Sequence, residues 1–258
     1  MIDYLQRRIL WDLKKAYGDL ECFDWNDLVE VLQTIYEKTK RAFVIIIDEW
    51  DCIFRKYPSS HEDHIKYLDF LRFWLKGKSY IVLAYMTGIL PIKKYGEHSA
   101  LNMFDEYSMT NQRELAEFTV YTENEVKELC KQYDMPYDKT KQWYDGYDLK
   151  GVQIYNPRSV VMSMLGHDFD SYWTKTETYE ALKKYIQMNQ YGLKEITTRL
   201  IAGEHIPVNP AKFQNDMTTF ASADDVLTLL VHLGYLTYDF YAQAVCIPNQ
   251  EVQKEFIK

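Results

Sequence analysis

The sequence predicts an α/β protein, in which a parallel sheet covered by helices precedes a mainly helical region. Residues 43–47 (FVIII) form a short apolar run without polar alternation, which is typical of a strand buried on both faces. A second apolar run, 80–86 (YIVLAYM), follows a helical pattern. Strand, helix and strand in this order predict a right-handed parallel crossover. After residue 110, helical spacing of apolar residues dominates.

Length, composition and charge exclude several classes of protein. The 258 residues allow one large domain or two modest ones, and the 47% hydrophobic content excludes a disordered chain. A net charge of -8 gives no general attraction to nucleic acid or to anionic membranes, so neither is an expected partner. There is no signal-peptide pattern, no membrane-length apolar run and no CxxC pair. We therefore expect a reducing, cytoplasmic setting.

The elements of the first 110 residues follow from periodicity and punctuation. We expect helices at 3–17, 26–39 and 61–75, strands at 43–47 and 80–86, a loop at 51–60, and one further short strand at 104–108. Gly18 stops the first helix, and either Asp24 or Asn26 can cap the second.

The remaining residues open with a capping box at 122–125 (TENE), which predicts a helix to about residue 133. We expect further helices near 137–145, 157–165, 177–189 and 192–202, an extended connection at 203–221, a helix at 222–233, strands at 235–238 and 244–247, and a last helix from 249. Helix, hairpin and helix of this size resemble a winged-helix unit. The predicted domains are a core (1–110), a helical lid (111–205) and a winged-helix-like domain (206–258).

Two carboxylates, Asp48 and Glu49, directly follow the strand predicted at 43–47. Ligands of parallel sheets gather beyond the carboxyl ends of the strands. An acid pair there has the form of a Walker B element, in which the Asp helps to hold Mg²⁺ and the next acid activates or positions water. The alternative is a core strand that ends in two solvated acids.

A phosphate loop is absent from the sequence. Residues 77–79 (GKS) have its last letters, but the glycine required five positions earlier is Arg72. The order of elements is also inverted, because this triplet leaves a helix and enters a strand. We interpret it as a turn that ends a helix.

Four segments in order carry a family resemblance: 44–49 (VIIIDE), 83–88 (LAYMTG), 143–147 (WYDGY) and 154–159 (IYNPRS). From about residue 25 onward the chain resembles the bacterial AAA-ATPase-like family, relatives of the archaeal and STAND-type P-loop ATPases. The resemblance implies a partial P-loop NTPase core. In that family a phosphate loop precedes these segments, and a restriction-endonuclease-like domain often follows the winged helix.

The resemblance also implies roles for individual residues. It assigns the Mg²⁺-side acid to Asp48, the water-positioning acid to Glu49, the sensor that faces the γ-phosphate to Thr87, and the lid start that lines the nucleotide base to Tyr155, Asn156 and Pro157. Each has a plain interpretation too, since Thr87 can simply end a strand and the aromatic residues can belong to the core.

Without a phosphate loop, we expect this chain to be a truncated piece, a fragmentary gene product or a protein that lost its N-terminal third. ATP and Mg²⁺ are the cofactors of an intact family member, and their binding here should be weak or absent. The alternative is a non-catalytic protein-interaction module derived from an ATPase. A shortened sheet exposes a strand edge and favours self-association.

Other functional sites have weaker support. Acids occupy the start of the helix predicted at 222–233, where a DNA-recognition helix needs basic residues. His61 and His64 share a helix face but have no apparent third metal ligand. The triplets 125–127 (EVK) and 148–150 (DLK) match a nuclease pattern only in letters.

Overall fold

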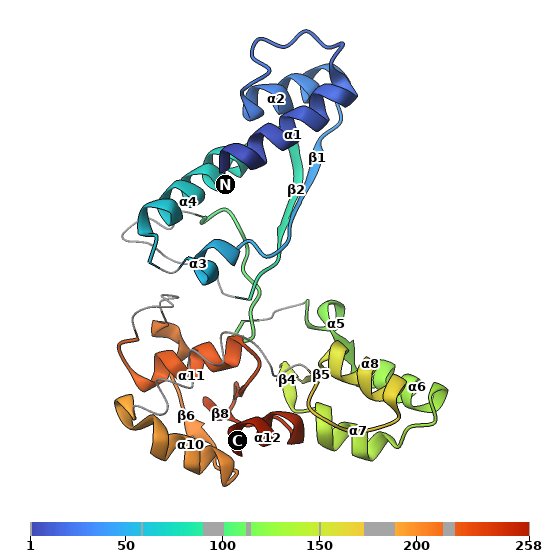
Figure 1. Cartoon of the computed structure of the whole chain (residues 1–258), viewed down its shortest axis with the longest axis vertical. Coiled ribbons are helices and arrows are strands. Elements are labelled where there is room, and N and C mark those ends of the chain that lie inside the picture. Colours follow the sequence, from blue (N-terminus) through green and yellow to red (C-terminus); the bar gives the residue numbers. More distant parts are fainter. Residues whose placement is uncertain are drawn as a thin grey trace. The chain divides into compact units, whose positions relative to one another are not determined.

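The computed structural model describes residues 2–57, 59–89, 101–111, 115–149, 151–172, 189–213 and 220–257. The chain divides into two compact units, 1–105 and 106–258, and each is described by itself (Figure 1). The mixed α/β class predicted from the sequence is confirmed, with small sheets among many helices. No helix in the described ranges has both the length and the apolarity needed to cross a membrane.

The first unit contains one parallel pair of strands and its helices. Its elements are α1 (Ile2–Tyr17), α2 (Leu28–Thr39), β1 (Phe43–Ile47), α3 (Cys52–Lys56), α4 (His61–Leu75) and β2 (Ile81–Met86). Strands β1 and β2 pair in parallel, with Val44 opposite Leu83 and Ile47 opposite Met86. The predicted parallel arrangement is therefore confirmed. Gly77, two residues after the end of α4, has a φ of +64°, which confirms the turn predicted at 77–79.

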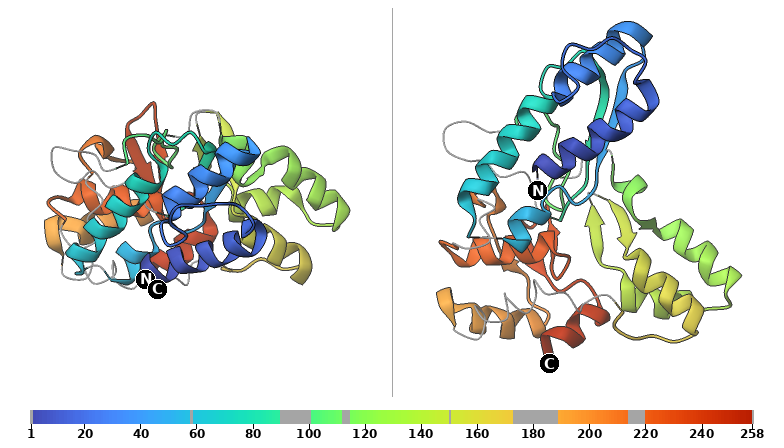
Figure 2. Two further views of the ribbon diagram at one scale, coloured as in Figure 1. Left: turned by 90° about the horizontal axis from the view of Figure 1, so that it is seen from above. Right: turned by 45° about the horizontal axis from the view of Figure 1, so that its top comes forward.

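The core of the first unit lies on one face of this sheet (Figures 1 and 2). Apolar side chains of α1, α2 and α4 pack with alternate strand residues such as Ile45 and Ile47. On the other face, Val44 is 55% exposed and Ile46 is 70% exposed. The prediction of a strand buried on both faces is therefore wrong, because the described helices cover only one face.

Three further predictions in the first 110 residues need correction. Asp27, and neither Asp24 nor Asn26, caps α2, because its Oδ1 accepts from the N–H groups of Val29 and Glu30. Residues 52–56, expected in a loop, form the short helix α3. Residues 104–108 contain no strand; Ser108 forms an isolated bridge with Asn111.

The second unit has two antiparallel sheets, with strand orders β3-β5-β4 and β6-β8-β7. Its elements are α5 (Ala116–Thr119), β3 (Tyr121–Thr122), α6 (Glu123–Gln132), α7 (Tyr137–Tyr144), β4 (Tyr147–Leu149), β5 (Val152–Tyr155), α8 (Pro157–Gly166), η1 (Gln190–Gly192), α10 (Leu193–Ile201), β6 (Ile206–Pro207), η2 (Pro210–Lys212), α11 (Ala223–His232), β7 (Thr237–Asp239), β8 (Ala244–Cys246) and α12 (Gln250–Ile257). The capping box that begins α6 is confirmed. The helix predicted at 177–189 falls almost entirely outside the described residues.

The segment 143–147 joins two parts of the second unit. The Tyr147 hydroxyl donates to the Gly234 carbonyl oxygen at 2.6 Å, and Asn249 Nδ2 donates to the Asp145 carbonyl oxygen at 2.8 Å. Helix α11, the β7–β8 hairpin and α12 follow one another as expected. Their assignment to a winged helix stays a prediction, as do the lid and the three-domain division.

Candidate functional site

The carboxyl ends of β1 and β2 meet at one edge of the parallel sheet. Backbone pairing continues past both strands, because the Thr87 N–H donates to the Ile47 carbonyl oxygen and the Trp50 N–H donates to the Thr87 carbonyl oxygen, each at 2.9 Å. The Thr87 hydroxyl donates a hydrogen bond to Asp48 Oδ1. The structure therefore brings together the two side chains to which the family resemblance assigns the Mg²⁺ side and the sensor position.

Glu49 lies beside this pair in an unusual backbone conformation. Its φ is +51°, in the left-handed region that a non-glycine residue seldom adopts and that is frequently found at functional sites. Its N–H donates to Asp48 Oδ1 at 3.0 Å, and its side chain is 62% exposed. The three residues Asp48, Glu49 and Thr87 thus form one polar edge, which we call the strand-end site.

Buried aromatic residues pack next to the strand-end site. Trp50 is buried and packs edge-on against Phe54, with ring centroids 5.4 Å apart. A Cβ atom at Gly88 would lie only 2.6 Å from the Trp50 ring. The close approach of residue 88 therefore requires a glycine.

Two charged residues that the sequence did not single out complete the surroundings. Asp51 is fully buried, and its carboxylate accepts from the Arg55 Nε at 3.1 Å and from the Ile89 N–H at 3.2 Å. Arg55 Nη2 also reaches Glu49 Oε2 at 3.3 Å. The signal available in the sequence was an acid directly after Asp48, Glu49 and Trp50 with an arginine four positions later, the spacing of a helical ion pair.

The predicted lid residues Tyr155, Asn156 and Pro157 lie in the second unit. Tyr155 is buried, and its hydroxyl lies 3.3 Å from that of Tyr137. Burial raises the pKa of the Tyr155 hydroxyl above its ordinary value. The Asn156 side chain caps α8 by accepting from the Ser159 N–H, and Pro157 is the first residue of that helix.

Glu123 anchors a polar cluster close to Tyr155. Hydrogen bonds from Tyr137, Lys141 and Lys127 lower the pKa of Glu123 to about 2.

The aromatic residues Trp143, Tyr144 and Tyr147 are buried, as Tyr155 is, which confirms the interpretation of these residues as core.

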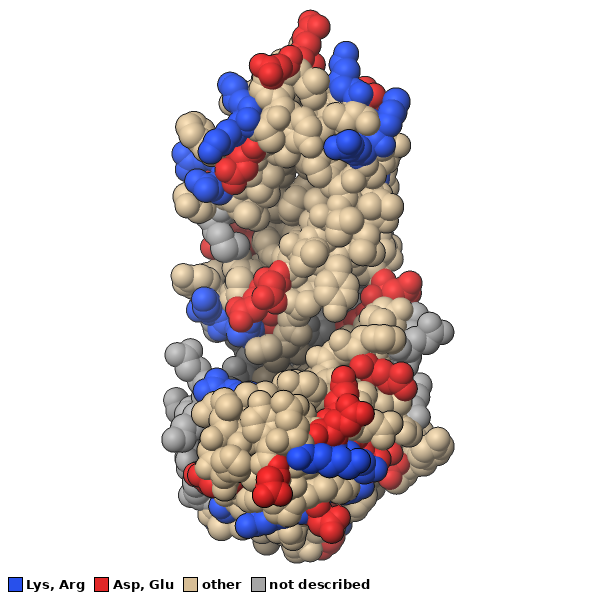
Figure 3. All heavy atoms as spheres, turned by 90° about the vertical axis from the view of Figure 1, so that its right-hand side faces the viewer, with Lys and Arg blue, Asp and Glu red and all other residues tan. Residues whose placement is uncertain are grey.

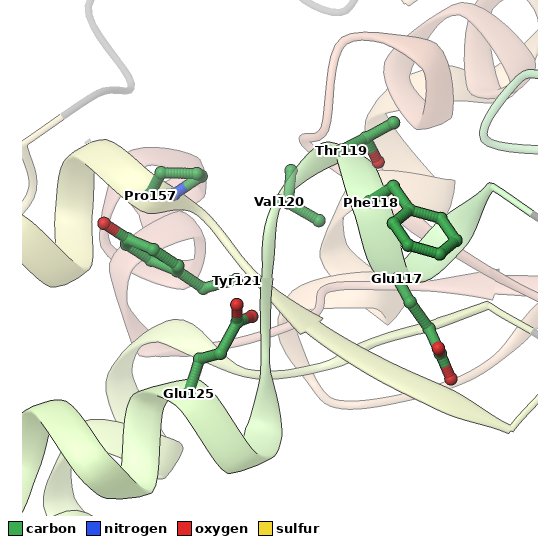
Figure 4. A pocket seen from close by; sticks show the side chains of 7 residues that line it. All are labelled: Glu117, Phe118, Thr119, Val120, Tyr121, Glu125 and Pro157. Carbon is green, nitrogen blue, oxygen red and sulfur yellow. The ribbon is translucent and has the colours of Figure 1, made fainter.

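A shallow pocket of about 410 Å³ adjoins the start of α8. In Figure 4 the Tyr121 ring lies below Pro157, and the Glu125 side chain rises from α6 towards the same space. Glu117, Phe118, Thr119 and Val120 form the remaining wall. Two carboxylates on the lining disfavour a triphosphate in this pocket by like-charge repulsion.

The strand-end site partly fits a Mg²⁺–nucleotide complex. Carboxylate and hydroxyl oxygens are the ligands that Mg²⁺ prefers, and the Asp48 and Glu49 side chains are accessible. The described residues include no group of three or more His, Cys, Asp or Glu side chains arranged to hold a metal ion by themselves. A Mg²⁺ ion bound by so few carboxylates usually takes its remaining ligands from water and substrate phosphates.

Comparison with known proteins gives no assignment. No family model matches the chain, and no solved structure matches it. A protein of Azotobacter chroococcum mcd 1, described as an uncharacterized protein in the vnfD 5'region, is 26% identical over 103 residues, which is 39% of this chain and 19% of that relative. The match therefore covers about a fifth of the relative's length.

Proposed function

We propose that this chain supplies the Walker B, sensor and lid portion of a bacterial AAA-like ATPase that hydrolyses ATP with Mg²⁺. The hydrogen bond between Thr87 and Asp48, at the carboxyl ends of adjacent parallel strands, is the observation that carries the proposal. It places an acid and a neutral hydroxyl side by side where ligands of such sheets gather.

Each residue of the strand-end site has a distinct role in the proposed reaction. Asp48 would hold the Mg²⁺ that accompanies the nucleotide, Glu49 would position the attacking water, and Thr87 would contact the γ-phosphate. Mg²⁺ bound to the nucleotide would neutralise the charge of the phosphates. The family resemblance assigns the start of the lid to Tyr155, Asn156 and Pro157, which lie in the second unit.

A phosphate loop is missing from the 258 residues, so we expect nucleotide binding to be weak. Loop amides supply much of the phosphate binding in P-loop enzymes.

The proposal is tested by titrating the isotope-labelled chain with Mg-ATP to roughly 10 mM, because a weak site is occupied only when the ligand concentration approaches Kd. We expect concentration-dependent shifts of the backbone NMR resonances of Asp48, Glu49 and Thr87. Asp48→Asn should abolish them, because it removes the charge that faces the Mg²⁺ complex.

Asp63→Asn is the matched control, since it makes the same chemical change at an exposed position at the start of α4. It should leave the titration unaltered. Resonances that stay fixed in the unmutated chain, or shifts that persist in Asp48→Asn, would contradict the proposal.

A second candidate function, an interaction module, is favoured by the uncovered face of β1 and β2. Exposed apolar side chains gather there: Val44, Ile46, Val82, Leu83 and Tyr85. Figure 3 views the first unit from the side on which these strands lie in Figure 1, and much of that surface is uncharged. Parallel sheets are normally covered on both faces.

A second copy of this chain is the occupant that we propose for this face. Five half-exposed apolar side chains present a few hundred Å² per copy, so a symmetric pair would bury roughly 1,000 Å², near the lower limit for a specific interface. The face has no charged strand residue to select a charged partner, and two-fold stacking pairs it with itself.

Self-association is measured by sedimentation over a range of protein concentrations. We expect a weak dimer that Ile46→Lys dissociates, because the substitution buries an unpaired charge. Ile65→Lys on α4 is the matched control, since Ile65 is also about half exposed and should leave the dimer intact. A monomer at every concentration would exclude a second copy of this chain as the occupant of this face.

A further inference from the structure

Asp51 is a buried carboxylate whose side chain does not cap the short helix that it precedes. It is the N-cap residue of α3, yet it forms no side-chain capping hydrogen bond. It is fully buried. Placing a carboxylate there is costly unless hydrogen bonds and an opposite charge compensate. The hydrogen bonds and the ion pair of Asp51 therefore indicate its structural role.

The contacts of Asp51 join the segments that follow β1 and β2. One oxygen accepts from the Ile89 N–H at 3.2 Å, two residues after Thr87. The same oxygen accepts from Arg55 Nε at 3.1 Å, and the other lies 3.5 Å from Arg55 Nη2. A single carboxylate thus fixes both the arginine and the segment that contains the proposed sensor.

Arg55 links Asp51 to the strand-end site through a hydrogen bond to Glu49. Its side chain is only 17% exposed, and its Nη2 donates to Glu49 Oε2 at 3.3 Å. An exposed ion pair normally contributes little, because holding two long side chains costs entropy. Here Asp51 has already immobilised the guanidinium, so the geometry offered to Glu49 is fixed in advance.

We infer that Asp51 and Arg55 act as positioning residues for Glu49 and Thr87. We call the pair the Asp51–Arg55 clamp. This inference rests on the proposed function for the catalytic meaning of Glu49 and Thr87. The clamp itself is a claim about local order, and it can be measured without nucleotide.

The first experiment follows amide hydrogen exchange by NMR in Asp51→Asn. We expect the Ile89 amide to exchange about tenfold faster or more, because a hydrogen bond to a charged acceptor becomes one to a neutral amide. Amides in the middle of α4, such as that of Leu71, should keep their rates. Asp63→Asn is again the control. A uniform acceleration throughout the first unit would indicate a merely structural role and overturn the inference.

The second experiment compares Arg55→Gln with Arg55→Lys, and it remains informative if Asp51→Asn does not fold. The readout is the NMR shift of the Glu49 side-chain carboxyl carbon. Arg55→Gln should move it, and Arg55→Lys should restore it only in part, because lysine is a point charge without the guanidinium fork. An unchanged Glu49 resonance in Arg55→Gln would overturn the inference.

Nucleotide separates this inference from the proposed function. With Mg-ATP, Arg55→Gln should weaken the response of Glu49 and Thr87 several-fold and leave that of Asp48 largely in place. If the unmutated chain shows no response while the exchange and carboxyl results appear, the ATPase proposal fails and the clamp stands. If Mg-ATP shifts the Glu49 and Thr87 resonances equally in the unmutated chain and in Arg55→Gln, the clamp does not position the proposed catalytic groups.

Discussion

At the scale of single residues, burial changes the chemistry of His232 at the end of α11. Its ring contacts that of Phe213, with centroids 5.6 Å apart. Loss of hydration lowers the pKa of His232 to about 4. A histidine kept neutral in the fold makes stability depend on pH.

We predict that the chain loses stability as pH falls from about 6.5 towards 4. In this window the unfolded chain binds a proton at His232 that the folded chain does not, so acid favours unfolding. The contribution is at most about 3 kcal/mol, at 1.36 kcal/mol per pKa unit. Urea unfolding at several pH values measures it.

His232→Gln should flatten this part of the pH profile, and His61→Gln serves as the control that removes an exposed histidine. A profile that keeps its slope in His232→Gln would contradict the prediction.

Glu123 affects stability in a lower pH range. Its stabilising contribution is present above about pH 4.5 and is lost as the pH falls towards 2.

At the scale of elements, the caps set where helices begin. Two neighbouring N–H groups at the start of α2 donate to the single oxygen Asp27 Oδ1, at 2.8 and 3.1 Å. Asp24 instead accepts from the backbone and side chain of Asn26. The two polar residues that the sequence offered as caps thus stabilise the preceding turn.

Asp27→Ala should lower the free energy of unfolding by about 1 kcal/mol, because it leaves helix-end donors without their acceptor and removes a charge that complements the helix dipole. Thermal unfolding measures the change. Asn26→Ala is the matched control and should cost less, since Asp24 keeps its bond to the backbone of residue 26. Equal losses would show that the turn, rather than the cap, limits stability.

At the scale of the whole molecule, both units depend on contacts between distant segments. In the first unit, the ends of two strands and the Asp51–Arg55 clamp converge on one edge. In the second unit, Gly146 lies against the backbone of Pro248. Its φ of +105° is a conformation that suits only glycine. A Cβ atom at Gly146 would lie 2.0 Å from the Pro248 carbonyl oxygen.

We predict that Gly146→Ala destabilises the chain by several kcal/mol or prevents folding, because it adds a backbone clash to an unfavourable φ. Gly151→Ala is the matched control, with a φ of +96° and no atom within 4 Å of the added Cβ. It should cost about 1–2 kcal/mol. Similar losses in the free energy of unfolding, measured with urea, would show that backbone strain alone explains the effect and that the contact to Pro248 adds nothing.

Local patterns in the sequence were enough for much of the fold. Helix α4 has the predicted limits, the capping box begins α6, and two apolar runs pair as parallel strands. For the site, the sequence placed Asp48, Glu49 and Thr87 at strand ends, because strand order alone brings such ends to one edge. The ATPase role of that edge stays a prediction.

What only the tertiary structure decided concerns partners that are remote in the chain. No periodicity could show that Val44 and Ile46 face an uncovered side, since an apolar run reads the same with or without a second layer of helices. The bond from Ile89 to Asp51 and the approach of Gly146 to Pro248 were likewise invisible. Local sequence determines which elements form, because their hydrogen bonds close within a few residues, whereas burial and site geometry depend on how those elements meet in space.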